Sequence, residues 1–259
     1  MGENNIITKV AITGNTLLTL KCMERILQFS NYRIISVFGL PKEKLKTKVN
    51  SIDLTDFCIR NNIKLFQTDN WDQFYNFCKK EDIDKIITLG DSRIIPKKIV
   101  NSFDTIGNHG AILPAVQGGA SLVWGRLLND GEWGISIMKI GEKVDSGDIL
   151  KVKKFNYESN ITEEKFTTIA DNLTVEALID VLRGDYLIMK NKRWAVRVAK
   201  HTDSFEATAI LKFCKDNKLP VYMPSRTPDD GVVDDTWPID FIRTFKIANN
   251  FPYPKWRDK

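Results

Sequence analysis

Short apolar runs and helical stripes alternate along the first ninety residues, and this alternation restricts the fold more than any other feature of the chain. The stretches between the runs carry apolar residues at helical spacing, for example Trp71, Phe74 and Cys78. Strands separated by helices form βαβ units, so this part of the sequence predicts a parallel sheet with helices on both of its faces. The runs expected to be strands are residues 10–14, 33–39, 63–66 and 85–90.

The second half of the chain continues this pattern and then changes it. A fifth apolar run, which ends at His109, and a short helix at residues 122–128 extend the series. Two runs with alternating apolar residues follow at 133–140 and 149–155, joined by a short connection that contains glycine. Such closely spaced runs predict antiparallel strands that complete the sheet.

The most regular helical pattern of the chain covers residues 162–183. Asn160 or Thr162 can cap its start and Gly184 can end it. The residues beyond it are rich in proline and turns. We therefore expect a Rossmann-like α/β fold with a mostly parallel sheet and helices on both faces over residues 1–188, followed by a small C-terminal subdomain over residues 189–259.

Composition excludes several classes of protein. The 259 residues contain 38 Lys and Arg against 33 Asp and Glu, a net charge of +5 that suits an anionic ligand but lacks the basic blocks of a nucleic-acid-binding protein. The sequence contains no run of about 18 apolar residues, so it predicts no membrane-spanning helix, and the N-terminus has no secretory signal pattern. The four widely spaced cysteines contain no C-x-x-C pair, which favours buried thiols in the cytoplasm and no metal site.

The residues whose side chains could take part in catalysis lie between positions 105 and 148. The turn after the first strand, Gly14-Asn15-Thr16, is not a G-x-G-x-x-G motif, so a dinucleotide fingerprint is not indicated. His109, one of two histidines, ends the fifth strand, and Asp145 lies on a Gly-containing turn between the two later strands. A histidine and an aspartate at neighbouring strand ends can converge, the carboxylate orienting the imidazole.

Taken in order, these motifs resemble the formyltransferases that use 10-formyltetrahydrofolate. The resemblance extends over about residues 8–184 and rests on Asn-His-Gly-Ala-Ile-Leu-Pro, Gly-Gly-Ala, Gly-Ile-Ser-Ile-Met and Val-Asp-Ser-Gly-Asp-Ile-Leu, which begin at positions 108, 118, 134 and 144. It implies that 10-formyltetrahydrofolate is the cosubstrate, with no metal, and that His109 and Asp145 are catalytic. It also implies that the folate pocket is bordered by Arg93, Ile94, Ile95, Ile140 and Val144.

One position departs from the family pattern. Aligning His109 with the family places Gly107 where the family has its catalytic asparagine, and Asn108 comes one residue late. On a regular strand this shift turns the side chain to the opposite face. A β-bulge at Gly107 could re-aim Asn108, which we take as the third catalytic residue. In the alternative, the amide is missing and the chain is a slow enzyme or a folate- or nucleotide-binding pseudoenzyme.

The C-terminal residues indicate a branch of the family. Residues 222–231 and 249–254 resemble the tail of the sugar N-formyltransferases. The length of this unit argues against the glycinamide ribonucleotide and methionyl-tRNA branches, and the start of the first strand at residue 9 argues against the deformylase branch, which has an N-terminal regulatory domain. The resemblance implies a dTDP- or UDP-linked amino-deoxysugar as substrate, destined for a surface polysaccharide such as the lipopolysaccharide O-antigen. The nucleotide, the sugar, its C-3 or C-4 amine and another small amine as acceptor stay open. A homodimer is expected through the C-terminal part, with Trp237, Phe241, Phe245 and Phe251 either at the contact or in the core.

Overall fold

A seven-stranded sheet forms the centre of the computed structural model, which describes residues 7–46, 48, 50–191, 194–249 and 256–258. Its strands are β1 (Thr8–Thr13), β2 (Tyr32–Gly39), β3 (Lys64–Gln67), β4 (Lys85–Thr88), β5 (Asp104–His109), β7 (Glu132–Lys139) and β8 (Ile149–Asn156). Their order is β3-β2-β1-β4-β5-β7-β8. The first five are parallel, whereas β7 runs antiparallel to both of its neighbours.

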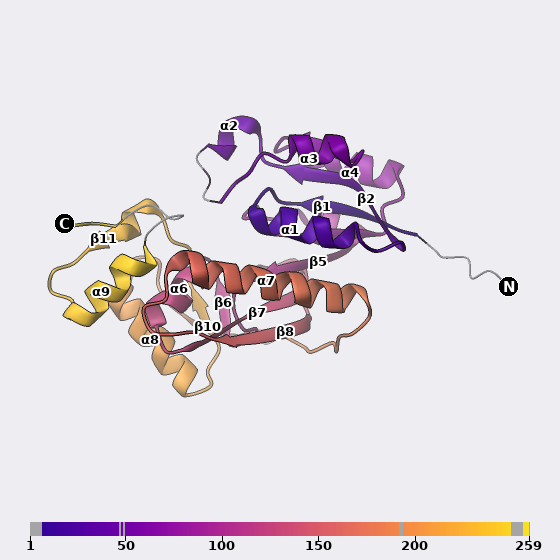
Figure 1. The fold of residues 1–259 in the computed structure, drawn as a ribbon. Coiled ribbons are helices and arrows are strands. Elements are labelled where there is room, and N and C mark those ends of the chain that lie inside the picture. The colour runs from indigo at the N-terminus through magenta and orange to yellow at the C-terminus, as the bar shows by residue number, and fades with distance from the viewer. Residues whose placement is uncertain (1–6, 47, 49, 192–193, 250–255, 259) are drawn as a thin grey trace.

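Helices cover both faces of this sheet because its strands alternate their apolar side chains between two cores (Figure 1). In β1, Val10 and Ile12 belong to one core and Ala11 to the other. The helices of the first face are α1 (Leu17–Ile26), α3 (Thr55–Arg60) and α7 (Glu163–Leu182), and those of the second are α4 (Trp71–Lys80) and α5 (Lys97–Ser102). The short helix α2 (Lys42–Leu45) follows β2. The predicted α/β fold is confirmed.

A second, three-stranded sheet joins the C-terminal residues to the first part of the chain. Parallel strand β10 (Val221–Met223) lies between β6 (Val116–Gly118) and β9 (Val196–Arg197). The expected boundary between residues 188 and 189 therefore falls between α7 and β9, but the strands on its two sides share one sheet. The remaining elements are α6 (Ser121–Leu128), α8 (Ser204–Asp216), a 3-10 helix (Pro228–Gly231), β11 (Val232–Val233), α9 (Ile239–Ala248) and β12 (Arg257–Asp258).

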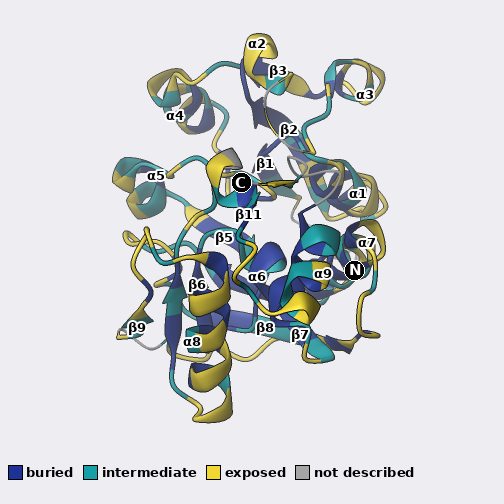
Figure 2. Cartoon of the chain, turned by 90° about the vertical axis from the view of Figure 1, so that its left-hand side faces the viewer, coloured by how far each residue is buried: buried dark blue, intermediate teal, exposed yellow. Residues whose placement is uncertain are grey.

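Burial accounts for several residues singled out from the sequence (Figure 2). All four cysteines are buried free thiols, as predicted. Trp237 and Phe241 contact Phe245, which is fully buried, so these rings form an aromatic cluster at α9. Phe251 and most of the tail motif at 249–254 lie outside the described residues. No helix in the described part of the chain is long and apolar enough to cross a membrane.

The strand order fixes where a ligand can bind. The order reverses between β1 and β4, and in such sheets ligands bind beyond the carboxyl ends of the strands at this point. Two glycines close the turns there: Gly14 has φ +132° and Gly90 has φ +61°. A Cβ atom on Gly14 would lie 2.0 Å from the Leu89 carbonyl oxygen, so the chain ends of β1 and β4 approach closely.

Candidate active site

A cavity of about 540 Å³ opens at the carboxyl ends of β4 and β5, between the start of α1 and the first half of α7. Its volume lies within the range of small-molecule sites. The residues after β4 and at the end of β5 form one wall, and the face of α7 forms another. The residues that line the cavity include Lys21, Gly90, Ser92, Asn108, His109, Ser121, Glu164, Thr167, Thr168 and Asp171.

His109 and Asp145 form a buried pair beside this cavity. The Nδ1 atom of His109 lies 3.4 Å from Oδ1 of Asp145, and the two residues are only 6% and 9% exposed. The other oxygen of Asp145, Oδ2, accepts a hydrogen bond of 2.8 Å from the backbone N–H of Gly118. His109 lines the cavity whereas Asp145 stands behind it. The carboxylate is thus placed to orient the imidazole.

The second nitrogen of the His109 ring is also engaged. Nε2 lies 3.0 Å from the carbonyl oxygen of Val116. A carbonyl oxygen can only accept, so Nε2 carries a proton and donates it to Val116. The two polar neighbours of the ring, the Asp145 carboxylate and the Val116 carbonyl, are therefore both hydrogen-bond acceptors. Both ring nitrogens of His109 are thus engaged by protein groups.

Asn108 reaches the cavity from a regular strand. The pairing of β5 with both of its neighbours shows no register shift over the described residues, so the bulge suggested from the sequence is absent from this strand. β4 ends at Thr88, opposite Gly107, and Asn108 therefore extends one residue beyond its neighbour. Its Oδ1 accepts a hydrogen bond of 3.1 Å from the backbone N–H of Gly90. That contact leaves the amide group, Nδ2, as the donor available to a ligand.

Gly107 leaves little space for a side chain. A Cβ atom at this position would lie 2.7 Å from Cδ1 of Ile140 and 3.3 Å from the Thr88 carbonyl oxygen. An asparagine there is possible only if the end of the Ile140 side chain moves. The glycine and the following asparagine thus form a local variation in which the amide enters the cavity from the next residue.

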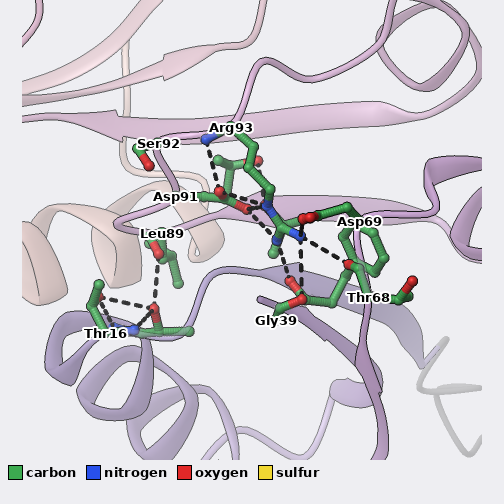
Figure 3. A network of polar contacts seen from close by, with 12 residues as sticks. Thr16, Gly39, Thr68, Asp69, Leu89, Asp91, Ser92 and Arg93 are labelled. Carbon is green, nitrogen blue, oxygen red and sulfur yellow. Dashed lines mark hydrogen bonds and ion pairs between the residues drawn. The ribbon is translucent and has the colours of Figure 1, made fainter. Parts of the chain in front are cut away.

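Arg93, which the resemblance assigns to the folate pocket, uses its guanidinium inside the protein. It contacts the Asp91 carboxylate at 2.7 Å and donates to the carbonyl oxygens of Phe38, Gly39 and Thr68 (Figure 3). The guanidinium carbon also lies 4.4 Å from the centre of the Phe38 ring. Arg93 therefore ties the loop after β4 to the ends of β2 and β3. Its role at a folate stays a prediction.

Of the four apolar residues expected at the folate, two are exposed and two pack against apolar cores. Ile94 and Val144 are 79% and 53% exposed. Ile140 packs on the small core of Leu113, Met138 and Ile149, and Ile95 packs on the core beneath α4 and α5. None of the four lines the cavity described above, and their role at a folate stays a prediction.

The wall formed by α7 is polar. Glu164, Thr167, Thr168 and Asp171 share one face of the helix, at a spacing of three or four residues. Nζ of Lys21, on α1, lies 3.8 Å from Oδ2 of Asp171. Burial raises the pKa of the Asp171 carboxyl to about 6 despite this cation. This wall offers hydroxyl and carboxyl groups to a hydrogen-bonding ligand.

Three contacts of the His109–Asp145 pair were not predicted from the sequence. They are made by the Val116 carbonyl, by the Gly118 amide and by Asn191, whose Nδ2 donates to the Asp145 carbonyl oxygen at 2.6 Å. The first two are backbone groups, which no side-chain motif can reveal. The Gly-Gly pair at 118 and 119 was the available signal. Among the described residues, no group of three His, Cys, Asp or Glu side chains could hold a metal ion.

The fold and the cavity define an α/β protein whose site is built on strand ends, with an amide, an imidazole and a carboxylate. Residues 10–182 match the sequence profile of the formyl transferase family. Because this match covers more than half of the chain, the chain belongs to that family.

Curated relatives of this chain include methionyl-tRNA formyltransferases. Methionyl-tRNA formyltransferase of Mycoplasma capricolum subsp. capricolum is 24% identical over 212 residues, which are 79% of this chain and 66% of that protein. Two further curated relatives are matched over 65% and 59% of their length, so the chain spans about two thirds or less of each.

Solved structures show the same fold. Methionyl-tRNA formyltransferase from Clostridium thermocellum has a TM-score of 0.66 at 16% identity, covering 98% of this chain and 88% of that chain. An N-formyltransferase from Helicobacter canadensis, solved with folinic acid and dTDP-3-aminofucose, has a TM-score of 0.62 at 16% identity, covering 93% and 80%.

Proposed function

We propose that this protein transfers the formyl group of 10-formyltetrahydrofolate to the amine of a nucleotide-linked amino-deoxysugar. The observation that carries this proposal is the convergence of the Asn108 amide and the His109 imidazole on one cavity, with the Asp145 carboxylate behind the ring. Membership of the formyl transferase family supplies the reaction class.

The site has the groups that formyl transfer requires. When an amine attacks the formyl carbon, a new C–N bond forms and the carbonyl oxygen gains negative charge. Nδ2 of Asn108 donates a hydrogen bond to that oxygen beside the His109 ring, and stabilising this charge is where enzymes of acyl transfer gain most of their rate. As the bond between the formyl carbon and N10 of the folate breaks, N10 takes a proton and the amine loses one. The His109–Asp145 pair assists these proton transfers when Nε2 exchanges its contact with the Val116 carbonyl for one with the substrate.

The surroundings of the cavity suit the two substrates. Hydroxyl groups of Ser121, Thr167 and Thr168 offer hydrogen bonds to a sugar ring. Lys48, whose Nζ donates to Oγ of the cavity residue Ser92 at 2.7 Å, brings a cation to the rim, where a diphosphate would bind. The exposed side chains of Ile94 and Val144 offer apolar surface to a pterin ring. The Helicobacter canadensis protein, solved with dTDP-3-aminofucose, provides the precedent for this substrate class on the same fold.

Formylation of methionyl-tRNA is the second candidate, because the first curated relatives are methionyl-tRNA formyltransferases. The net charge of +5 is small for a protein that must hold a tRNA, and we therefore place this function second. The position of Asn108 in the cavity, next to Gly107, supports the enzyme over the pseudoenzyme alternative.

A substrate panel tests the proposal. Purified protein receives 10-formyltetrahydrofolate with dTDP- and UDP-linked 3-amino and 4-amino sugars, with initiator methionyl-tRNA or with glycinamide ribonucleotide, and products are identified by mass spectrometry. We expect an N-formyl sugar nucleotide and one tetrahydrofolate per product. Formylation of methionyl-tRNA at equal or higher efficiency would overturn the sugar assignment, and absence of any formyl product from the panel would overturn the transfer reaction.

A further inference from the structure

The segment that follows α7 runs back along the turn that carries Asp145. Met189 exchanges two backbone hydrogen bonds of 2.8 Å with Ile149, and Nζ of Lys190 lies 2.6 Å from Oδ2 of Asp148. The next residue, Asn191, donates from Nδ2 to the carbonyl oxygen of Asp145 at 2.6 Å. Three consecutive residues, 189–191, thus contact the turn in antiparallel order. We call residues 189–191 the buttress segment.

The backbone of Asp145 needs such support. Its φ of +50° lies in the left-handed region, which residues with a side chain disfavour and which an aspartate adopts when its carboxylate hydrogen-bonds locally. Nothing in the side chain of Asp145 supplies this support, since both carboxylate oxygens face other groups: His109 and the Gly118 amide. The hydrogen bond from Asn191 restrains the main chain at the same residue. Asp145 is thus held from outside its own turn, at the carboxylate by His109 and Gly118 and at the backbone by Asn191.

Asn191 is an unusual choice for a purely structural contact. Its Oδ1 is buried and has no hydrogen-bond partner in the described part of the protein. Burying an unpaired carbonyl oxygen costs stability of the same order as the Nδ2 contact gains. The net stabilisation of the fold by this amide is accordingly small. Its definite effect is on the position of one carbonyl group, which belongs to the residue that faces His109.

We propose that Asn191 is a positioning residue, which holds the backbone of Asp145 through Nδ2 and thereby keeps the carboxylate against His109. This inference rests on the proposed formyl transfer, in which Asp145 acts through the imidazole. It extends the site to the junction between α7 and the C-terminal residues, because the buttress segment lies between α7 and β9. Without the contact, Asp145 relaxes toward negative φ and its carboxylate leaves both Nδ1 of His109 and the Gly118 amide.

Three variants separate this role from simple packing. Asn191→Ala removes the amide, Asn191→Asp keeps its shape but removes the donor, and Lys190→Ala is the matched control on the same segment with a side chain 84% exposed. We expect kcat to fall about ten- to a hundredfold in both Asn191 variants, with KM for each substrate unchanged within about twofold, because misplacing a group by about 1 Å has effects of this size. Lys190→Ala should retain wild-type kcat.

A double-variant comparison shows whether Asn191 acts through the pair. In a His109→Ala background, Asn191→Ala should lower the remaining rate by less than twofold, since the group that Asp145 orients is gone. A further loss equal to that in the wild-type background would overturn the proposal, as would wild-type kcat in Asn191→Asp.

A spectroscopic readout keeps the proposal testable apart from activity. The amide proton of Gly118, which donates to the Asp145 carboxylate, should lose its downfield NMR shift and its protection from hydrogen exchange in Asn191→Ala but not in Lys190→Ala. If wild-type protein transfers no formyl group, the proposed function fails while this amide signal still decides whether Asn191 holds Asp145. An unchanged Gly118 signal in Asn191→Ala would overturn the positioning role.

Discussion

Gly118 connects the C-terminal part of the chain to the His109–Asp145 pair, and its substitution by alanine tests that connection. The residue has φ +97°, and its N–H donates to Oδ2 of Asp145. A Cβ atom added there would lie 2.0 Å from the carbonyl oxygen of Met223 on β10. Real Cβ atoms essentially never lie closer than 3.0 Å to such an atom. Gly118→Ala must therefore move β6 and β10 apart by about 1 Å.

The size of the effect follows from two terms. The left-handed φ costs an alanine about 1–2 kcal/mol, and forcing a backbone apart in a packed region adds about 1–3 kcal/mol. We expect the free energy of unfolding to fall by about 2–5 kcal/mol in total. Because the same shift displaces the donor to Asp145 by about 1 Å, kcat should fall by about a hundredfold.

Gly184 offers a matched control for this experiment. It has φ +83°, but an added Cβ would meet no atom within 4 Å. Gly184→Ala should therefore show only the conformational term of about 1–2 kcal/mol and wild-type kcat. Urea unfolding and formyl transfer are measured for both variants below their unfolding midpoints. A folded Gly118→Ala variant with kcat within twofold of wild type would refute the coupling of β10 to the pair.

Three further variants address the amide and the buried acid. Asn108→Ala should lower kcat by roughly a hundred- to a thousandfold, about 3–4 kcal/mol, with folate affinity retained, because it removes an oxyanion donor; a silent variant in steady-state assays would remove Asn108 from the site. Gly107→Asn should destabilise the protein by about 1–3 kcal/mol in thermal unfolding, since Ile140 must move, and should not raise kcat; a gain in kcat would mean that the usual position of the amide is the productive one. Glu163 is buried beside Arg126, and burial raises the pKa of its carboxyl to about 7. The folded state therefore holds a proton that the unfolded chain releases near pH 4.5. The resulting contribution to stability is present below pH 4.5 and is lost as the pH rises through 7. The difference in unfolding free energy between wild type and Glu163→Gln should therefore change over pH 4.5–7, and a constant difference would show that Glu163 ionises normally.

Much of the fold was predictable because local signals agreed with the final structure. The helix predicted at 162–183 has Thr162 as its cap, with Oγ1 accepting from the Lys165 amide, and Gly184 follows its end. The runs predicted as strands alternate between the two cores as expected. Strand β6 was not predictable, because it has three residues and pairs with a strand more than a hundred positions away. Such pairing leaves no periodic pattern in the sequence.

The site was predictable in its residues but not in its contacts. The motif order led to Asn108, His109 and Asp145, and their catalytic roles stay predictions. The direction of Asn108 depends on where β4 ends, which the sequence placed two residues too late. Arg93 was expected to face a ligand, but its guanidinium meets carbonyl groups at the ends of two strands, β2 and β3, which only tertiary structure brings to the loop after β4.

The most direct test of the account compares the two histidines of the chain. Wild type, His109→Ala and His201→Ala are given 10-formyltetrahydrofolate and the amino-sugar nucleotide that the wild type formylates best, and single-turnover rates of product formation are measured. The account predicts a loss of about a hundredfold or more for His109→Ala, the size expected for one acid–base or oxyanion group, with unchanged unfolding. It predicts little change for His201→Ala. Equal rates in His109→Ala and wild type would contradict the assignment of this cavity as the site of formyl transfer.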